Sequence, residues 1–232
     1  MKITIIIPCF NESKYIEQVI SEVNLQEIND KQIIVVDDGS TDGTVDKLKK
    51  LKEDGKVNNL VFHENNKGKG AAIRSAIKHV EGDIIIIQDA DLEYNPKDYL
   101  RLIKPITEGK ADVVYGSRFL GGGGDAHRVL YFWNRVANAI LTTFTNILVD
   151  MNLTDMETGY KVFKKKVFED IQIEEDRFGF EPEITVKLGK KKLRFFEVGI
   201  SYNGRTYQEG KKIGLKDGFR AIYCLVKYRF FS

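Results

Sequence analysis

The chain has 232 residues, of which 42% are hydrophobic and 30% are charged, so it is long enough to bury the core of one large domain. Its 36 basic and 34 acidic residues nearly cancel and leave a net charge of +2. This balance argues against a partner that is a nucleic acid, because a nucleic-acid binder carries a marked excess of positive charge. Any basic site in this chain must therefore be local.

Two isolated cysteines, Cys9 and Cys224, show neither a metal-binding spacing nor a disulfide framework, which indicates a reducing compartment. The apolar start of the chain ends too abruptly at Pro8 for a signal peptide. The longest uncharged run, 136–149, falls short of the roughly 20 residues that a bilayer-spanning helix needs. We therefore expect a cytoplasmic protein without a spanning segment.

The first half of the chain alternates short apolar runs, which predict strands, with amphipathic stretches, which predict helices. The expected strands are 2–7, 32–37, 59–64, 83–88 and 111–117. The expected helices are 14–26, 43–53, 69–80 and 96–107, the last with Asn95 as its cap and Pro96 in its first turn. Strands that are apolar on both faces and alternate with helices predict an α/β fold, with a parallel sheet covered by helices on both faces.

The second half has a different pattern. Its elements in chain order are a mobile glycine-rich loop at 121–125, a long aromatic helix at 128–150, short helices within 160–188, a strand at 193–202 and an amphipathic helix at 215–231.

Polar and glycine motifs follow the strands of the first half, at the ends where parallel sheets bind ligands. They are Pro8, the pair Asp37 and Asp38, the stretch 67–70 and the acids of 89–93. Because the carboxyl ends of parallel strands share one edge of a sheet, we expect these motifs to converge there.

Asp89, Asp91 and Glu93 alternate directly after a run of four isoleucines. On an extended segment, alternate side chains face the same way. Three carboxylates so placed would bind a hard cation such as Mg²⁺ or Mn²⁺, which takes few protein ligands and keeps positions for substrate phosphates. The alternative is that the aspartates only cap the following turn.

Several segments resemble family-2 glycosyltransferases with a GT-A fold, namely IIIPCFNE (5–12), VVDDGSTDGT (35–44), NNKGKGAAI (65–73), QDADLEYNP (88–96) and GSRF (116–119). The later segments are similar to the dolichyl-phosphate mannose synthase branch, namely TDMETGYKVF (154–163), RFGFEPEI (177–184) and SYNGRTYQEGKK (201–212).

The resemblance implies an α/β GT-A domain at 1–212, with a mostly parallel, twisted sheet and helices on both faces. Within it, 1–120 would bind a nucleotide sugar and 121–212 an acceptor, and 213–232 would form an amphipathic, membrane-interfacial helix.

For the donor, the resemblance implies that Asp89 and Asp91, on either side of Ala90, hold the divalent metal on the diphosphate, with Glu93 as a third ligand. Asp37 or Asp38, with Asp38 preferred, would accept a hydrogen bond from the base. The implied nucleotide-sugar contacts are Pro8, Asn11, Glu12, Asp37, Asp38, Gly68, Lys69, Gly70, Asp89, Ala90 and Asp91. Alternatively, Asn11 forms a turn or a helix cap. A dinucleotide fingerprint beginning at Gly68 is disfavoured, because Ile73 replaces its third glycine.

For the acceptor, five cations suggest a phosphate clamp, because a guanidinium fork matches phosphate oxygens, although each alone is typical of a solvated surface. They are Arg118, Arg128, Arg135, Arg205 and Lys211. The implied catalytic residues are Asp91, Arg118 and Arg205. A phosphate acceptor is already anionic, whereas a sugar hydroxyl needs a base, for which Glu181 and Glu183 are the candidates.

The implied reaction is an inverting transfer of a hexose from GDP-mannose or UDP-glucose to dolichyl or undecaprenyl phosphate, with Mg²⁺ or Mn²⁺. A carbohydrate hydroxyl acceptor, a non-catalytic nucleotide-sugar binder and a nucleotidyltransferase are the alternatives. The apolar helices at 128–150 and 215–231 have the profile of interfacial helices, so we expect peripheral contact with the cytoplasmic face of a membrane. A separate membrane-anchoring partner is compatible with this picture.

Overall fold

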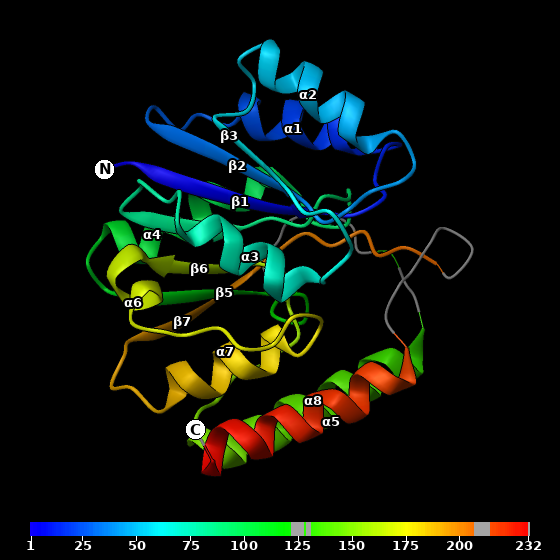
Figure 1. Cartoon of the computed structure of the whole chain (residues 1–232). Coiled ribbons are helices and arrows are strands. Elements are labelled where there is room, and N and C mark those ends of the chain that lie inside the picture. The colour runs from blue at the N-terminus through cyan, green and yellow to red at the C-terminus, as the bar shows by residue number, and fades with distance from the viewer. Residues whose placement is uncertain (122–127, 129–130, 207–213, 232) are drawn as a thin grey trace.

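The computed structural model describes residues 1–121, 128, 131–206 and 214–231, and it shows a sheet between two layers of helices (Figure 1). Beyond Gly121, the expected glycine-rich loop lies outside the described residues. The strands are β1 (Ile3–Cys9), β2 (Lys31–Asp37), β3 (Asn59–Phe62), β4 (Ile84–Ile87), β5 (Val113–Ser117), β6 (Lys161–Lys164) and β7 (Phe195–Gly199). The described strands form one sheet in the order β3-β2-β1-β4-β6-β5-β7, and every pairing is parallel except those of β6.

Strand β6 corrects the prediction of helices throughout 160–188. It pairs antiparallel with β4 and with β5, for example Phe163 with Ile85 and Val162 with Val114. The β6 side chains Val162 and Phe163 are fully buried, one toward each face of the sheet. A run of four residues is too short for periodicity to separate strand from helix, and tertiary pairing decides it here. The short helices expected after it are confirmed as α6 (Lys165–Glu169) and α7 (Phe180–Gly189).

The alternation of buried isoleucines divides the core between the two faces of the sheet. Ile84 and Ile86 of β4 belong to one hydrophobic cluster, and Ile85 and Ile87 belong to the other. The first cluster includes residues of α1 (Ile16–Leu25), α2 (Thr44–Glu53) and α4 (Tyr99–Thr107), and the second includes residues of α3 (Lys69–Ile77), α6 and α7. The four-isoleucine run is therefore buried on both sides, as expected for a central strand covered by helices.

The start of α4 confirms the cap that was expected there. A short 3₁₀ helix, η1 (Pro96–Asp98), precedes α4, and the Asn95 side chain accepts a hydrogen bond of 3.0 Å from the backbone N–H of Lys97. Pro96 occupies the first turn, where its missing N–H costs nothing.

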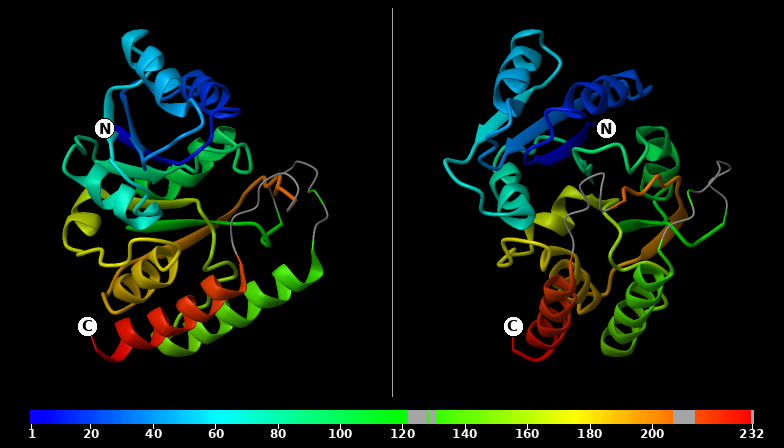
Figure 2. Two further views of the ribbon diagram at one scale, coloured as in Figure 1. Left: turned by 45° about the vertical axis from the view of Figure 1, so that its right-hand side comes forward. Right: turned by 90° about the vertical axis from the view of Figure 1, so that its right-hand side faces the viewer.

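Two further helices, α5 (Phe132–Val149) and α8 (Leu215–Phe230), lie side by side below α7 (Figures 1 and 2). A third hydrophobic cluster joins them to α7 through Val149, Val186, Cys224, Leu225 and Tyr228. In the described ranges, no helix is both long enough and apolar enough to cross a bilayer.

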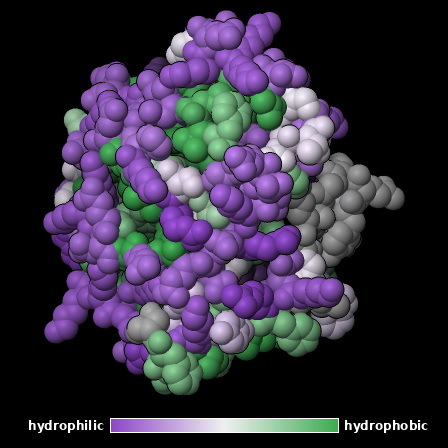
Figure 3. Space-filling model, viewed as in Figure 1, coloured by the Kyte–Doolittle hydropathy of each residue, from purple (hydrophilic) through white to green (hydrophobic). Residues whose placement is uncertain are grey.

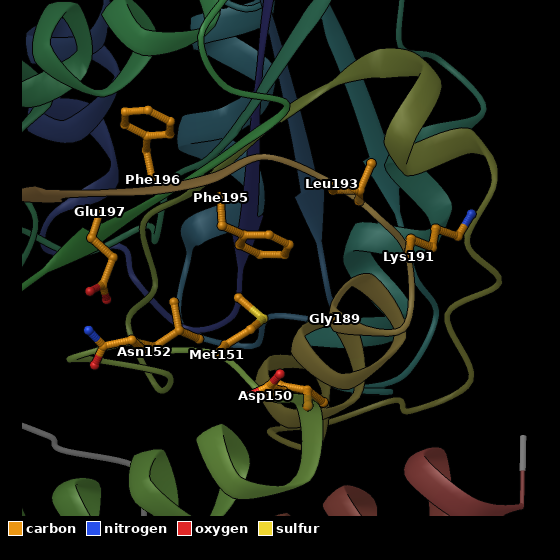
Figure 4. Close-up of a pocket in the computed structure, with 11 residues that line it drawn as sticks. Asp150, Met151, Asn152, Gly189, Lys191, Leu193, Phe195, Phe196 and Glu197 are labelled. Atoms are coloured by element: carbon orange, nitrogen blue, oxygen red, sulfur yellow. The ribbon is translucent and has the colours of Figure 1, made fainter.

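A cavity of about 390 Å³ lies where the end of α5, the end of α7 and the start of β7 meet (Figure 4). Phe195, Leu193 and Met151 supply apolar walls, and Asn152 and Lys191 add polar groups. Gly189 places this cavity at the carboxyl end of α7, whereas Glu181 and Glu183, which the sequence singles out, lie in the first turn of α7.

The carboxyl ends of β1, β2, β4 and β5 share one edge of the sheet, because these strands run in the same direction. In Figure 1, β1 starts at the marked N-terminus and runs to the right, so the right-hand panel of Figure 2 faces this edge. The register of β1 and β2 brings Cys9 level with Asp37. The loops after these strands are therefore neighbours, as the sequence predicted.

Candidate active site

The acids that follow β4 do not lie on an extended segment. The chain bends over residues 90–93, and the carboxylate of Asp91 accepts the backbone N–H of Glu93 at 3.1 Å. As a result, Asp89 faces one cation, Lys69, while Asp91 and Glu93 face another, Arg205. The expectation that all three carboxylates share one direction is thus wrong for this stretch.

Lys69, in the first turn of α3, bridges two carboxylates from distant parts of the chain. Its Nζ lies 2.7 Å from Asp89 Oδ1 and 2.8 Å from Glu181 Oε1. Burial alone lowers the pKa of Lys69, but the two carboxylates outweigh burial and raise this pKa above its ordinary value. Lys69 is therefore a fixed cation at the amino ends of α3 and α7.

Arg205 lies among three carboxylates at the ends of β1 and β4. Its guanidinium lies 2.5 Å from Asp91 Oδ2 and 3.3 Å from both Glu12 and Glu93. The backbone N–H of Arg205 also donates to Glu93 at 2.7 Å, and the Tyr202 hydroxyl donates to the other oxygen of Glu93 at 2.9 Å. Both oxygens of Glu93 are thus in use by the segment 202–205.

The donor chemistry of the acidic cluster fits a divalent cation held by Asp89 and Asp91. Burial and the charges of Asp89 and Glu93 raise the pKa of Asp91 to about 7, although Arg205 opposes this. Carboxylates crowded in this way are stabilised by added positive charge, and oxygen ligands suit Mg²⁺ and Mn²⁺. Among the residues that the structure describes, no three Asp, Glu, His or Cys side chains are grouped to hold a metal, and the Glu93 carboxylate accepts from Tyr202 and Arg205. The role of Glu93 as a third ligand stays a prediction.

Asp37 and Asp38, at the end of β2, differ in how many partners they have. The Asp38 carboxylate lies 2.6 Å from His63 Nδ1 and accepts from the Asn66 amide and from the backbone N–H groups of Lys67 and Gly68. Asp37 Oδ2 accepts from the backbone N–H of Ser40, and within the described part of the chain its buried Oδ1 has no hydrogen-bond partner. Asp38 therefore fixes the loop after β3, while Asp37 keeps a free acceptor.

The loop after β1 is tied to the loop after β2. Asn11 has a left-handed backbone (φ 52°), and its side chain accepts the backbone N–H of Thr41 at 2.8 Å. The backbone N–H of Glu12 donates to Thr44 Oγ1, and the Glu12 carboxylate reaches Arg205. Pro8, which lies within β1 beside this loop, is half-buried. Asn11 thus acts as a turn residue, and Glu12 points into the acidic cluster.

The glycines of the stretch 67–70 allow another backbone segment to approach closely. A Cβ on Gly70 would lie 2.0 Å from the carbonyl oxygen of Glu175, and one on Gly68 would lie 2.4 Å from that of Asp176. Gly68 also has a positive φ of 111°, which favours glycine. In this structure the segment that approaches these glycines is 175–177.

Four of the five expected acceptor cations gather around two aromatic rings and the segment 202–205. Arg118 stacks 5.2 Å from the Tyr202 ring and 5.6 Å from the Phe119 ring, and Arg135 also lies 5.6 Å from the Phe119 ring. Arg128 donates to the carbonyl oxygen of Gly204 at 3.1 Å, next to Arg205. The fifth cation, Lys211, lies outside the described residues.

Arg118 is held in place by Asp155. Its Nε and Nη2 each donate to this carboxylate at 2.7 Å, and Asp155 is completely buried. Such a two-pronged pair fixes the plane of a guanidinium. Arg118 is therefore a rigid part of the site, and it lies directly after β5.

The two glutamates considered as bases are already engaged. Glu181 pairs with Lys69. Glu183 is fully buried, and it accepts from the backbone N–H groups of Glu174 and Glu175 and from Lys187. Glu183 therefore acts as a structural residue of the loop 174–175.

Sequence reasoning missed several buried polar atoms on α5 and in the segment 157–158. In the described ranges, the side-chain nitrogens of Asn134 and Asn138, Thr158 Oγ1 and Glu157 Oε1 have no hydrogen-bond partner. The side-chain oxygen of Asn138 accepts a hydrogen bond of 3.4 Å from Arg118 Nη2. The signal was present in the sequence, because Asn134 and Asn138 are four residues apart and therefore lie on one face of the helix.

A buried lysine supports the turn that carries Glu157 and Thr158. Lys161 Nζ donates to the carbonyl oxygens of Met156 and Thr158 at 2.7 and 2.8 Å, and the residue is completely buried. Burial and the nearby charge of Glu181 raise the pKa of Glu157 to about 8. A carboxyl group with a raised pKa therefore lies close enough to Glu181 and to Arg118 to feel the charge of both.

Residues 4–172 match the family described as "Glycosyl transferase family 2". A UDP-N-acetylglucosamine–dolichyl-phosphate N-acetylglucosaminyltransferase from Methanococcus voltae is 31% identical, over 97% of this chain and 94% of that protein. The dolichol-phosphate mannosyltransferase of Pyrococcus furiosus is 30% identical over 98% of this chain, and the glycosyltransferase AglJ of Haloferax volcanii is 31% identical over 88%. The chain spans only 64% and 63% of the lengths of these last two relatives.

The fold is shared with glucosyl-3-phosphoglycerate synthase from Mycobacterium tuberculosis, whose crystal structure contains Mn²⁺, UDP and phosphoglyceric acid. The TM-score is 0.71 at 18% identity, over 100% of this chain and 79% of that one. This likeness confirms the GT-A fold. On the family match and the relatives together, the chain belongs to glycosyl transferase family 2, in the branch of the polyprenyl-phosphate glycosyltransferases.

Proposed function

We propose that this chain is an inverting glycosyltransferase that moves a hexose from a nucleotide diphosphate sugar, GDP-mannose or UDP-glucose, to a polyprenyl phosphate. The observation that carries the proposal is the gathering of four arginines beside the Asp-x-Asp carboxylates. Arg118 and Arg135 share the Phe119 ring, and Arg128 contacts Gly204 next to Arg205. Guanidinium groups suit phosphate oxygens, which the acceptor would present.

On the donor side, Asp37 Oδ1 is available to accept an N–H of the nucleobase, in preference to the fully engaged Asp38. Asp89 and Asp91 would hold Mg²⁺ or Mn²⁺, which supplies positive charge to the diphosphate that leaves. Lys69, in the first turn of α3, holds Asp89 in place.

On the acceptor side, the arginines would orient the lipid phosphate so that its oxygen lies in line with the bond that breaks. Attack from that side at the anomeric carbon inverts its configuration, and no proton has to be removed from a phosphate anion. This agrees with the engagement of Glu181 by Lys69 and of Glu183 by Lys187 and backbone N–H groups. The names of two relatives, which act on dolichyl phosphate, support the same acceptor class.

One observation favours the alternative of a carbohydrate hydroxyl acceptor. Glu157 has a raised pKa of about 8 and a buried oxygen without a partner among the described residues, as a general base could have. Glu157→Gln separates the two reactions. It should abolish transfer if Glu157 is the base, and it should leave at least a third of the activity if the acceptor is a phosphate.

A lipid acceptor requires contact with a membrane, and α5 with α8 offers a surface for it. Hydrophobic residues show along the lower edge of the molecule in Figure 3, where these helices lie. Exposed apolar side chains are Phe132, Trp133, Ile140 and Ile147 on α5 and Phe219, Ile222, Tyr223 and Phe230 on α8. Arg135 and Arg229 add positive charge that would attract anionic headgroups.

The direct test is transfer of a radiolabelled hexose. We expect label from GDP-mannose or UDP-glucose to appear in a lipid-extractable product that mild acid cleaves, and Asp91→Asn to abolish it. Label that stays in polysaccharide or protein would contradict the lipid acceptor. Glu108→Gln, which alters an exposed pair with Lys110, serves as the control with normal transfer.

A further inference from the structure

Arg205 cannot hold an acceptor phosphate while it keeps the contacts seen in this structure. Its three nitrogens face three different carboxylates, those of Asp91, Glu12 and Glu93. A guanidinium has three nitrogens in one plane, and here each of them is engaged by a different carboxylate. A phosphate that approached here would also meet three like charges.

The side chain and the backbone of Arg205 are held by different groups. Three hydrogen bonds fix the backbone of the segment, because Glu93 accepts from the N–H groups of Asn203 and Arg205 and from the Tyr202 hydroxyl. The guanidinium is held mainly by charge, at 2.5 Å from Asp91 and 3.3 Å from the other two acids. The side chain can therefore exchange partners while Glu93 keeps the segment in place.

A divalent cation and the guanidinium compete for the same carboxylate. Asp91 is the acid closest to Arg205, and it is also one of the two aspartates whose chemistry fits a metal. A cation bound to Asp91 would repel the guanidinium and would neutralise the carboxylates that retain it. Both effects favour release of the Arg205 side chain from the acidic cluster, on the segment where Arg128 contacts Gly204.

We propose that Arg205 is an internal counter-cation of the acidic cluster, which the divalent metal displaces, and that its release completes the acceptor-phosphate site. Glu93 is then a positioning residue that anchors the segment 202–205 and is not a metal ligand. The acceptor identity in this proposal rests on the proposed function, but the exchange of cations does not. Metal and acceptor phosphate bind cooperatively, because each one favours the same position of Arg205.

The first test is the affinity of the free protein for Mn²⁺ alone, measured by the EPR signal of unbound Mn²⁺. Arg205→Ala should bind Mn²⁺ about tenfold more tightly than the unaltered chain, within the usual range for a coupling between sites. Arg205→Lys should lie between them, because a single ammonium cannot span three carboxylates. Unchanged or weaker binding by Arg205→Ala would overturn the exchange.

Arg194→Ala is the matched control, because Arg194 forms a two-pronged pair with Asp112 away from this edge. Its Mn²⁺ affinity should equal that of the unaltered chain. Glu93→Gln tests the positioning role. Its Mn²⁺ affinity should be unchanged or higher, and a loss of tenfold or more would identify Glu93 as a ligand and overturn that part of the proposal.

The second test is the effect of farnesyl phosphate on the Mn²⁺ affinity. Saturating farnesyl phosphate should tighten Mn²⁺ binding at least fivefold in the unaltered chain and should have little effect in Arg205→Ala. Equal effects in the two proteins would contradict the coupling. If the chain transfers no sugar to any prenyl phosphate, the proposed function is wrong. The Mn²⁺ measurement would still decide whether Arg205 exchanges with the metal.

Discussion

At the scale of single residues, the site separates groups that hold its shape from groups that remain available. Asp38 accepts four hydrogen bonds from residues 63–68, and Asp37, its neighbour, keeps one buried oxygen without a partner in the described residues. Substitution of Asp37 and substitution of Asp38 should therefore affect different properties of the protein.

The prediction is that Asp37→Asn weakens nucleotide binding by roughly tenfold without lowering stability, because an amide at the free position turns an acceptor into a donor. Asp38→Asn should instead lower the free energy of unfolding by roughly 3 kcal/mol, because an amide cannot accept all four hydrogen bonds. Calorimetric titration with GDP and UDP, together with urea unfolding, distinguishes the two. Equal losses of stability in both variants would contradict this division.

The sequence predicted these residues better than it predicted their partners. Composition and position after a strand identify Asp37, Asp38, Asp89 and Asp91. Which oxygen remains free depends on donors about 30 residues away, such as Asn66 and Gly68, and on salt bridges more than 100 residues away, such as Arg205 with Asp91. Local patterns carry no information on such contacts, so the bend at 90–93 and the position of Glu93 could not be foreseen.

At the scale of elements, Asp112 stabilises the position of β6 between β4 and β5, at the carboxyl end of β6. This residue precedes β5, and its carboxylate receives two hydrogen bonds from the Arg194 side chain and one of 2.7 Å from Lys164. The hydrogen bonds from Arg194, together with Lys164, outweigh burial and lower the pKa of Asp112 below its ordinary value. One side chain thus joins the starts of β5 and β7 to the end of β6.

The sign of the pH effect follows from this lowered pKa. A carboxyl with a lower pKa in the folded state stabilises the fold fully above its unfolded pKa of about 3.9, and this stabilisation is lost progressively as the pH falls from that value through the folded pKa. Asp112→Asn should therefore lower the free energy of unfolding by roughly 2 kcal/mol at pH 7, with a difference that shrinks below about pH 4.

Urea unfolding of both proteins at pH 7 and pH 3 measures this difference. Glu108→Gln, which alters an exposed pair with Lys110, is the control and should show no measurable change at either pH. A difference between Asp112→Asn and the unaltered chain that stayed constant from pH 7 to pH 3 would show that the charge of Asp112 is not responsible.

At the scale of the whole molecule, the sheet places the donor and acceptor groups on one edge, and α5 and α8 form a layer beneath α7 that ends near that edge (Figure 2). The parallel sheet and its site edge were predictable from the alternation of strands and helices. The docking of α5 and α8 on α7 was not, because the same apolar spacing serves a core helix and an interfacial helix.

The prediction for this layer concerns vesicles that contain anionic lipid. Glutamates at both Ile140 and Ile147, which are 61% and 74% exposed on α5, should reduce binding to such vesicles at least about tenfold, because two apolar side chains no longer enter the interface. Leu100→Glu alters a side chain that is 48% exposed on α4 and is the matched control. Co-sedimentation measures all three proteins, and equal binding would exclude α5 from the membrane contact.

The central claim is that the acceptor is a phosphate carried by a lipid. The most direct measurement offers the chain a radiolabelled nucleotide sugar with a matched pair of acceptors, a prenyl phosphate and the prenol of the same length. We predict that label enters the prenyl phosphate only and that Arg118→Ala and Arg205→Ala reduce this transfer by at least a hundredfold. Label in the prenol, or equal transfer to both lipids, would contradict the account.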